Sequence, residues 1–260
     1  MKAASSQTAD ANRLDVLTTL VQRQLRLRTK RSMLGLVWPI ASPFLLMALY
    51  VFVFRSVFRV PIPRYPDFLL CGLLPWAYLT FTLNRSITSI STDPELVRKI
   101  GPRCELLPLT EAVTGSLYFV ITIAIFAVTL AARGELPVTT LPVVVLPVLA
   151  TVLVVASLAL AVSLIDVYNH DVRIVFSNAL TVWFFLLPGV YRAAMAPSGL
   201  HFLQSVDPMN LIIGQMRDLM YLGQINHPEK LVEMVLLAAA LFAGTLWMFR
   251  RLAVDLPKDV

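Results

Sequence analysis

Charged residues are scarce in this sequence of 260 residues. Only 15% of its side chains are Asp, Glu, Lys or Arg, whereas 57% are hydrophobic. An ordinary soluble domain has about a quarter of its residues charged. One globular core cannot bury so much apolar surface, so we expect the surplus to face lipid. The low charge therefore argues against an ordinary soluble protein and indicates an integral membrane protein.

Motifs for chemistry are also missing. The sequence has no Gly-x-x-x-x-Gly-Lys-Ser/Thr phosphate loop and no Gly-x-Ser-x-Gly or Ser-His-Asp context. The two cysteines, Cys71 and Cys104, lack metal or redox spacing, and we expect them to lie too far apart to bridge. For the group Asp166, His170 and Asp171 we expect structural polar contacts, with a metal or proton site as the alternative. We therefore predict no catalytic residue, no metal and no cofactor bound by this chain.

Apolar segments long enough to cross a membrane recur along the chain. A helical span needs about 20 apolar residues. Six segments meet this requirement, at 34–56, 68–91, 109–132, 141–165, 172–191 and 230–250. No flexible linker or clear repeat interrupts them. The sequence therefore predicts an all-α integral membrane fold in which residues 1–260 form a single domain with six transmembrane helices.

The cations indicate how the spans are oriented. The formal charge is +6, and seven Lys and Arg residues precede position 34. If the N-terminus is cytoplasmic, the cytoplasmic segments hold about twice as many Lys and Arg residues as the outer ones. We therefore take the positive charge as a topology signal rather than nucleic-acid binding. We expect a multi-pass protein of the cytoplasmic membrane with both termini in the cytoplasm.

Residues 10–31 have the pattern of an amphipathic helix lying in the membrane surface. The apolar residues of one face are Leu14, Leu17, Val21 and Leu25. The cations expected at the interface are Arg23, Arg26, Lys30 and Arg31. Gly35, Pro39 and Pro43 follow, and the two prolines predict that the first span is bent. The alternative is that the cations only set the topology of that span.

The loop after the second span contains a short, well-delimited amphipathic segment, residues 93–101. Asp93 and Pro94 favour a helix start, and Gly101-Pro102 ends it. Its six helical residues are Glu95, Leu96, Val97, Arg98, Lys99 and Ile100. Two helical turns are too short to be stable alone. We therefore expect a partner surface to cover the apolar side, with a solvated connector as the alternative.

Two further features bear on transport. Aromatic residues gather near the first two spans and include Trp38, Tyr50, Trp76, Tyr78 and Phe81. Their rings could stack on sugars that slide past, whereas interfacial belts and lipid packing are the alternative. Ionisable residues are rare within the spans, with Arg85 the main exception. Carriers coupled to protons or ions need intramembrane carboxylates, so we expect the energy for transport to come from elsewhere.

Three segments, RSMLGLVW, GLLPWAYL and ELVRKIGPRCELLPL, resemble the membrane subunits of ABC-2-type polysaccharide exporters, and the likeness covers about residues 22–222. The resemblance implies a bacterial inner-membrane homodimer that encloses a channel for a lipid-linked glycan such as O-antigen, capsule or teichoic acid. It also implies two copies of a separate ATPase subunit, which binds ATP and Mg²⁺. Residues 93–101 would be the coupling helix and residues 10–31 the interface helix against that ATPase. Residues 192–229 would form short external helices.

Two other functions stay open at this point. One is an ABC-2 permease for a drug or a small lipid, which shares the fold without the glycan channel. The other is a membrane-embedded glycosyl- or acyltransferase. An enzyme would need acidic or histidine residues in a water-facing loop, and the loop with Asp207, Asp218 and His227 is the only place that offers them.

Overall fold

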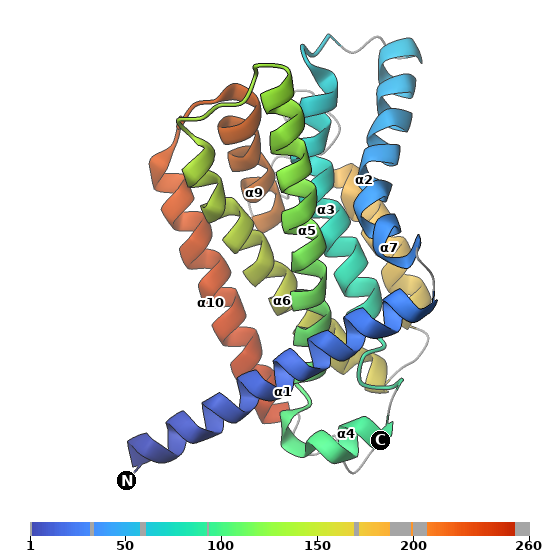
Figure 1. Cartoon of the computed structure of the whole chain (residues 1–260), viewed down its shortest axis with the longest axis vertical. Coiled ribbons are helices and arrows are strands. Elements are labelled where there is room, and N and C mark those ends of the chain that lie inside the picture. Colours follow the sequence, from blue (N-terminus) through green and yellow to red (C-terminus); the bar gives the residue numbers. More distant parts are fainter. Residues whose placement is uncertain are drawn as a thin grey trace.

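The computed structural model describes residues 2–31, 34–57, 61–92, 94–168, 172–187, 199 and 207–252, and every regular element in these ranges is a helix. The predicted all-α fold is thus confirmed. The long helices of the bundle are α2 (Leu34–Phe52), α3 (Tyr65–Ser86), α5 (Leu106–Ala132), α6 (Val145–Tyr168), α7 (Val172–Leu186) and α10 (Pro228–Leu252). The N-terminal helix α1 (Lys2–Arg31) crosses one end of this bundle obliquely (Figure 1).

Five helical segments of the described chain are long and apolar enough to cross a membrane. They are Val37–Arg55, Tyr65–Ser86, Leu106–Ala132, Leu141–Asp166 and Pro228–Leu252. The segment Arg173–Leu186 is apolar but shorter, and the predicted end of this span at 191 lies outside the described residues. The count of six spans therefore stays a prediction.

Helices α2 and α3 differ most in how deeply they are buried. Only 6% of the apolar window of α2 is buried, against 78% for α3, so α3 forms the centre of the bundle and α2 its edge (Figure 1). Pro39 and Pro43 lie inside α2, and its last turn continues as a π-helical turn, Val53–Val57. Each proline lacks the N–H that would bond to the carbonyl four residues before it, so the first half of α2 has two fewer backbone hydrogen bonds than a regular helix.

The second predicted span ends earlier than we expected. We predicted a helix to residue 91, but α3 ends at Ser86 and residues 87–92 form turns. Serine and threonine hydroxyls explain the difference, because they donate to nearby backbone carbonyls and compete with helical geometry. Ser89 Oγ donates to the Ser86 carbonyl at 2.8 Å, and Thr92 Oγ1 donates to the Thr88 carbonyl at 2.6 Å.

Helix α9 (Pro208–Met216) and the π-helical turn Arg217–Leu222 lie within the region where we predicted short helices before the last span. Their apolar side chains face the main core, where Met209, Ile212 and Met216 are fully buried. Helix α9 contacts α3, α6 and α10 and lies among the long helices (Figure 1). This segment is therefore part of the bundle's packing.

A second apolar cluster closes the end of the bundle where α1 crosses. Its buried members come from five helices and two turns, and are Leu20, Ile90, Val97, Cys104, Leu106, Leu107, Leu160, Leu164 and Phe249. Among them Val97 belongs to the short helix α4 (Pro94–Ile100). We call this end of the molecule the α4 end. The cluster joins α1, α4, α5, α6 and α10 in one packed layer.

Candidate functional site

Three buried carboxylates mark the α4 end. Glu105 and Glu111 lie at the start of α5, and Asp166 lies near the end of α6. A carboxylate buried in an apolar layer is costly unless an opposite charge pairs with it. Each of the three pairs with at least one arginine from a different helix. These pairs tie the layer together beyond its apolar contacts.

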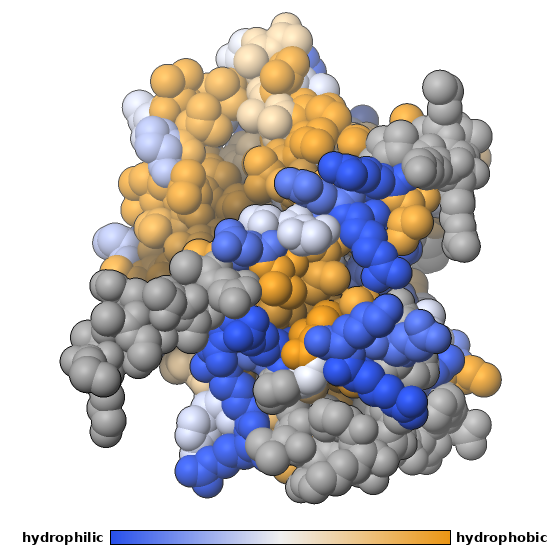
Figure 2. All heavy atoms as spheres, turned by 60° about the horizontal axis from the view of Figure 1, so that its bottom comes forward, coloured by the Kyte–Doolittle hydropathy of each residue, from blue (hydrophilic) through white to orange (hydrophobic). Residues whose placement is uncertain are grey.

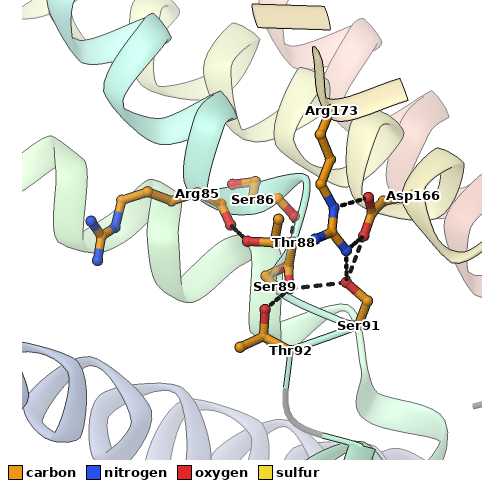
Figure 3. A network of polar contacts seen from close by, with 8 residues as sticks. All are labelled: Arg85, Ser86, Thr88, Ser89, Ser91, Thr92, Asp166 and Arg173. Carbon is orange, nitrogen blue, oxygen red and sulfur yellow. Dashed lines mark hydrogen bonds and ion pairs between the residues drawn. The ribbon is translucent and has the colours of Figure 1, made fainter. Parts of the chain in front are cut away.

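The first pair, Asp166 with Arg173, is also bonded to Ser91 in the turn that leads into α4 (Figure 3). Arg173 at the start of α7 donates to both oxygens of Asp166, from Nε to Oδ1 at 2.5 Å and from Nη2 to Oδ2 at 2.8 Å. Ser91 Oγ donates to Asp166 Oδ2 at 2.5 Å and accepts from Arg173 Nη2 at 3.0 Å. The structural polar contacts expected for Asp166 are thus present, whereas His170 and Asp171 lie outside the described residues.

The second group fastens α1 to the bundle. Glu111 accepts hydrogen bonds from Gln24 and Arg28 of α1 and from Arg85 at the end of α3, with Arg28 at 3.0 Å and Arg85 at 3.1 Å. The Arg28 guanidinium also lies beside two rings that contact each other, 5.0 Å from the centroid of Phe81 and 5.5 Å from that of Tyr118. These cation–π contacts add to the ion pair.

Burial lowers the pKa of Arg28, and the nearby Arg85 charge lowers it further, whereas Glu111 raises it. Because the pKa of Arg28 is lowered overall, Glu111 does not fully compensate the cost of burying the Arg28 charge. Arginine still remains protonated at neutral pH because its ordinary pKa is so high. The third pair, Glu105 with Arg250 at 3.5 Å, holds the end of α10 against α5.

The predicted coupling residues divide into two sets. Val97 is fully buried in the second cluster, and Leu96 and Ile100 are half-buried against it. Glu95, Arg98 and Lys99 are exposed. The apolar side of α4 is thus covered largely by its own chain, and the surface that a partner can reach is mainly charged. Asp93, the predicted cap, lies outside the described residues.

Helix α1 extends over the predicted range but buries a face slightly different from the one we expected. Leu14 is 63% exposed, whereas Leu20 and Val21 are buried and Gln24 and Arg28 face Glu111. The predicted interface cations Arg23 and Arg26 are exposed, and the side chains of Lys30 and Arg31 lie outside the described ones. Sequence reasoning missed Gln24, Arg28 and Glu111. The four-residue spacing of Gln24 and Arg28 was the only local signal.

The five predicted channel aromatics do not form one continuous row. Trp76 and Tyr50 both contact Phe184, at centroid distances of 5.4 and 5.9 Å. Tyr78 stacks on Phe119 at 5.1 Å and is buried. The remaining two are Phe81, which lies beside Tyr118 and Arg28, and Trp38, which is 62% exposed. A role in lining a channel stays a prediction for all five.

Known relatives resemble almost the whole chain. No protein-family model matches the sequence. The O-antigen export system permease protein RfbA of Myxococcus xanthus is 30% identical over 240 residues, which cover 91% of this chain and 92% of the relative. The chain belongs to this family of ABC-2 export permeases. Two RfbA permeases of Klebsiella pneumoniae are 29% and 26% identical, each over 215 residues that cover 82% of this chain and 83% of the relative.

The polar groups described at the α4 end link helices to one another. The described residues hold no group of three His, Cys, Asp or Glu side chains that could bind a metal ion. Cys71 and Cys104 are both buried and free, as expected. The buried carboxylates are instead bound to arginines that link helices. Its relatives and its long apolar helices identify the chain as a multi-pass membrane transport protein, and its polar network is suited to holding helices in register.

Proposed function

We propose that this permease is the transmembrane subunit of an ATP-driven exporter that moves a lipid-linked cell-envelope polysaccharide across the bacterial cytoplasmic membrane. The observation that carries the proposal is the likeness, over 91% of the chain, to an O-antigen export permease. Because the sequence has no phosphate loop, ATP and Mg²⁺ would bind to a separate ATPase subunit.

The proposal includes a homodimer around the glycan path, with two ATPase subunits beneath it. Large apolar side chains on the outer helices support a second copy. Phe52 of α2 and Ile174, Val175 and Val182 of α7 each expose 60% or more of their surface. A second chain would cover part of this surface, and lipid would cover the rest.

The α4 end would face the cytoplasm and receive the ATPase. The charged surface of α4, formed by Glu95, Arg98 and Lys99, would contact that subunit, and the exposed side of α1 would lie against it. Movement of α4 would reach α7 through Ser91, Asp166 and Arg173, because these three side chains join the loop before α4 to the start of α7.

Purification with the ATPase subunit tests the proposal directly. We expect the complex to hydrolyse ATP faster when the lipid-linked polysaccharide of its host is added, and to respond weakly to drugs or small lipids. The reverse preference would favour the small-substrate permease. No copurifying ATPase, with glycosyl or acyl transfer by the purified chain alone, would contradict the proposal.

A charge-reversed variant tests the coupling surface. Arg98→Glu with Lys99→Glu should reduce copurification of the ATPase while the protein still inserts in the membrane, because both side chains are exposed. Lys230→Glu is the control, since it reverses an exposed positive charge at the end of α10 remote from α4. Equal copurification of both variants would remove the coupling role from α4.

A further inference from the structure

A pocket of about 570 Å³ opens at the α4 end between α1, the end of α3, α4 and the start of α5. Its charged lining consists of Arg23, Arg28, Arg85 and Glu111, and two of these arginines, Arg28 and Arg85, share the one carboxylate. Figure 2 views the molecule with this end brought forward and shows hydrophilic side chains gathered below the hydrophobic flank of the bundle. The pocket therefore combines an excess of positive charge with a position at the edge of the apolar surface.

The position of the lining residues along their helices fixes the depth of the pocket. Arg85 lies in the last turn of α3, and Glu111 lies in the second turn of α5. Both helices are long and apolar enough to span a membrane. Where one span ends and the next begins, the surroundings change from hydrocarbon to lipid headgroups. The pocket thus lies at the level of the headgroups of one membrane face.

The carboxylate in the pocket does not balance the arginines around it. Glu111 accepts from both Arg28 and Arg85, which share its single negative charge. Arg28 exposes only 9% of its side chain, and within the described part of the chain its Nε and Nη1 atoms have no hydrogen-bond partner. Buried guanidinium groups are normally paired and hydrogen-bonded, so this site favours an additional anion.

Arg85 offers the groups that an anion could reach. Only its Nε is bonded to Glu111, and its side chain is 42% exposed. Figure 3 shows its guanidinium turned away from the pair formed by Arg173 and Asp166. Asn84, also exposed, adds an amide beside it on the pocket wall. A guanidinium fork matches the oxygen geometry of phosphate better than a point charge does.

An apolar cleft adjoins the arginines on the other side. Phe81 and Tyr118, which both lie beside the Arg28 guanidinium, also line a narrow cleft with Pro39 and Pro43 of α2. Polar groups thus lie on one side of Arg28 and apolar groups on the other. This arrangement suits an amphiphile, with its phosphate in the pocket and its hydrocarbon chain towards α2, better than a free inorganic ion.

We propose that this pocket binds the phosphate group of an anionic lipid at the membrane face of the α4 end. Two sources share this chemistry, namely an acidic phospholipid of the surrounding membrane and the phosphate end of a polyprenyl-linked glycan. The second source rests on the proposed export function, whereas the first does not. Arg85 and Arg23 are the residues whose charge the lipid would meet at the open side of the pocket.

Titration of the purified full-length protein in detergent with defined lipids, followed by native mass spectrometry, tests the proposal. We expect phosphatidylglycerol to bind at least about tenfold more tightly than zwitterionic phosphatidylcholine, and inorganic phosphate not to displace it. Arg85→Gln and Arg23→Gln should each weaken phosphatidylglycerol binding, Arg85→Gln by about tenfold or more. Arg26→Gln is the matched control, because it removes a charge from exposed α1 outside the pocket.

Several outcomes would overturn the inference. Equal affinity for the two phospholipids would contradict the role of charge, and equal weakening by Arg85→Gln and Arg26→Gln would contradict the location. Displacement by inorganic phosphate would show that the pocket binds free anions. If Arg85→Gln does not fold, Arg23→Gln carries the test because its side chain is exposed.

Polyprenyl phosphate separates the two sources. If an equimolar amount of polyprenyl phosphate displaces phosphatidylglycerol, the pocket is assigned to the substrate. If it does not, the pocket is assigned to membrane phospholipid. The binding readout needs neither ATP nor a glycan. Lipid binding in a protein that exports no polysaccharide would therefore refute the proposed function alone, and export without lipid binding would refute this inference alone.

Discussion

Arg173 and Asp166 bind each other through two hydrogen bonds, although they are seven positions apart and belong to different helices. The Asp166 side chain is fully buried, whereas that of Arg173 remains 38% exposed. Ser91 completes the group from the turn that precedes α4. The pair thus joins the end of α6, the start of α7 and the approach to α4 at one point.

Removing Arg173 should destabilise the protein. Arg173→Met leaves a buried, charged Asp166 without its main partner, and we expect a loss of roughly 1.5–3 kcal/mol in the free energy of unfolding. Chemical denaturation in detergent, monitored by circular dichroism, measures this loss of stability. The double variant Arg173→Met with Asp166→Asn should lose less than the sum of the single variants. Additive losses would mean that the two side chains do not interact.

Removing Glu111 should release α1 from the bundle. Glu111→Ala leaves Arg28 buried without its acceptor, so we expect faster amide hydrogen exchange over residues 20–28 and a stability loss of about 3 kcal/mol or more. Hydrogen exchange with mass spectrometry measures the first effect. Glu95→Ala, which removes an exposed carboxylate from α4, should leave exchange in α1 unchanged. Unchanged exchange in Glu111→Ala would show that apolar contacts alone hold α1.

Gly115 allows α3 and α5 to approach closely. A Cβ at this position would overlap Thr82 Oγ1 and lie 2.9 Å from Tyr78 Cε2. We therefore expect Gly115→Ala to lower stability by about 1–3 kcal/mol through overpacking. Gly244→Ala in α10 is the matched control, because a Cβ there meets nothing within 4 Å and alanine favours the helix. Thermal unfolding midpoints of the two variants should therefore shift in opposite directions.

Thiol labelling of introduced cysteines can test the orientation of the protein in the membrane. Val138 follows α5 at the end remote from α4, and Asp15 lies on exposed α1. In intact cells an impermeant thiol reagent should modify Val138→Cys and spare Asp15→Cys, because the cation-rich end is expected to be cytoplasmic. The native cysteines are buried and should contribute little background. Labelling of Asp15→Cys from outside would invert the topology.

The sequence was most informative where the signal is local. Apolar length predicted the long helices because a span must satisfy its backbone and cover about 30 Å of hydrocarbon within one segment. Pro94 and Gly101 likewise marked both ends of α4. The end of α3 was predicted too late, because hydrophobicity and hydroxyl content do not show where side chains begin to compete for backbone carbonyls.

The site depends on contacts that no local pattern contains. Glu111 and Arg28 are 83 positions apart, and nothing in either segment identifies the other as a partner. We expected a second protein to cover Val97, because a two-turn helix cannot be stable alone. Its own chain supplies the covering surface instead, from Leu20 and Phe249 at the two ends of the sequence. Such tertiary contacts follow from the arrangement of the whole bundle.

The burial of Val97 also has a mechanical consequence. Close-packed interiors are barely compressible, so a side chain fixed on every side cannot slide without moving its neighbours. Val97 shares one cluster with Leu20 of α1 and Phe249 of α10. A force applied to α4 would therefore be transmitted to the whole packed layer of five helices rather than absorbed by a local hinge. The long helices that begin or end in this layer are stiff, so a small tilt at the α4 end would produce a larger displacement at their far ends.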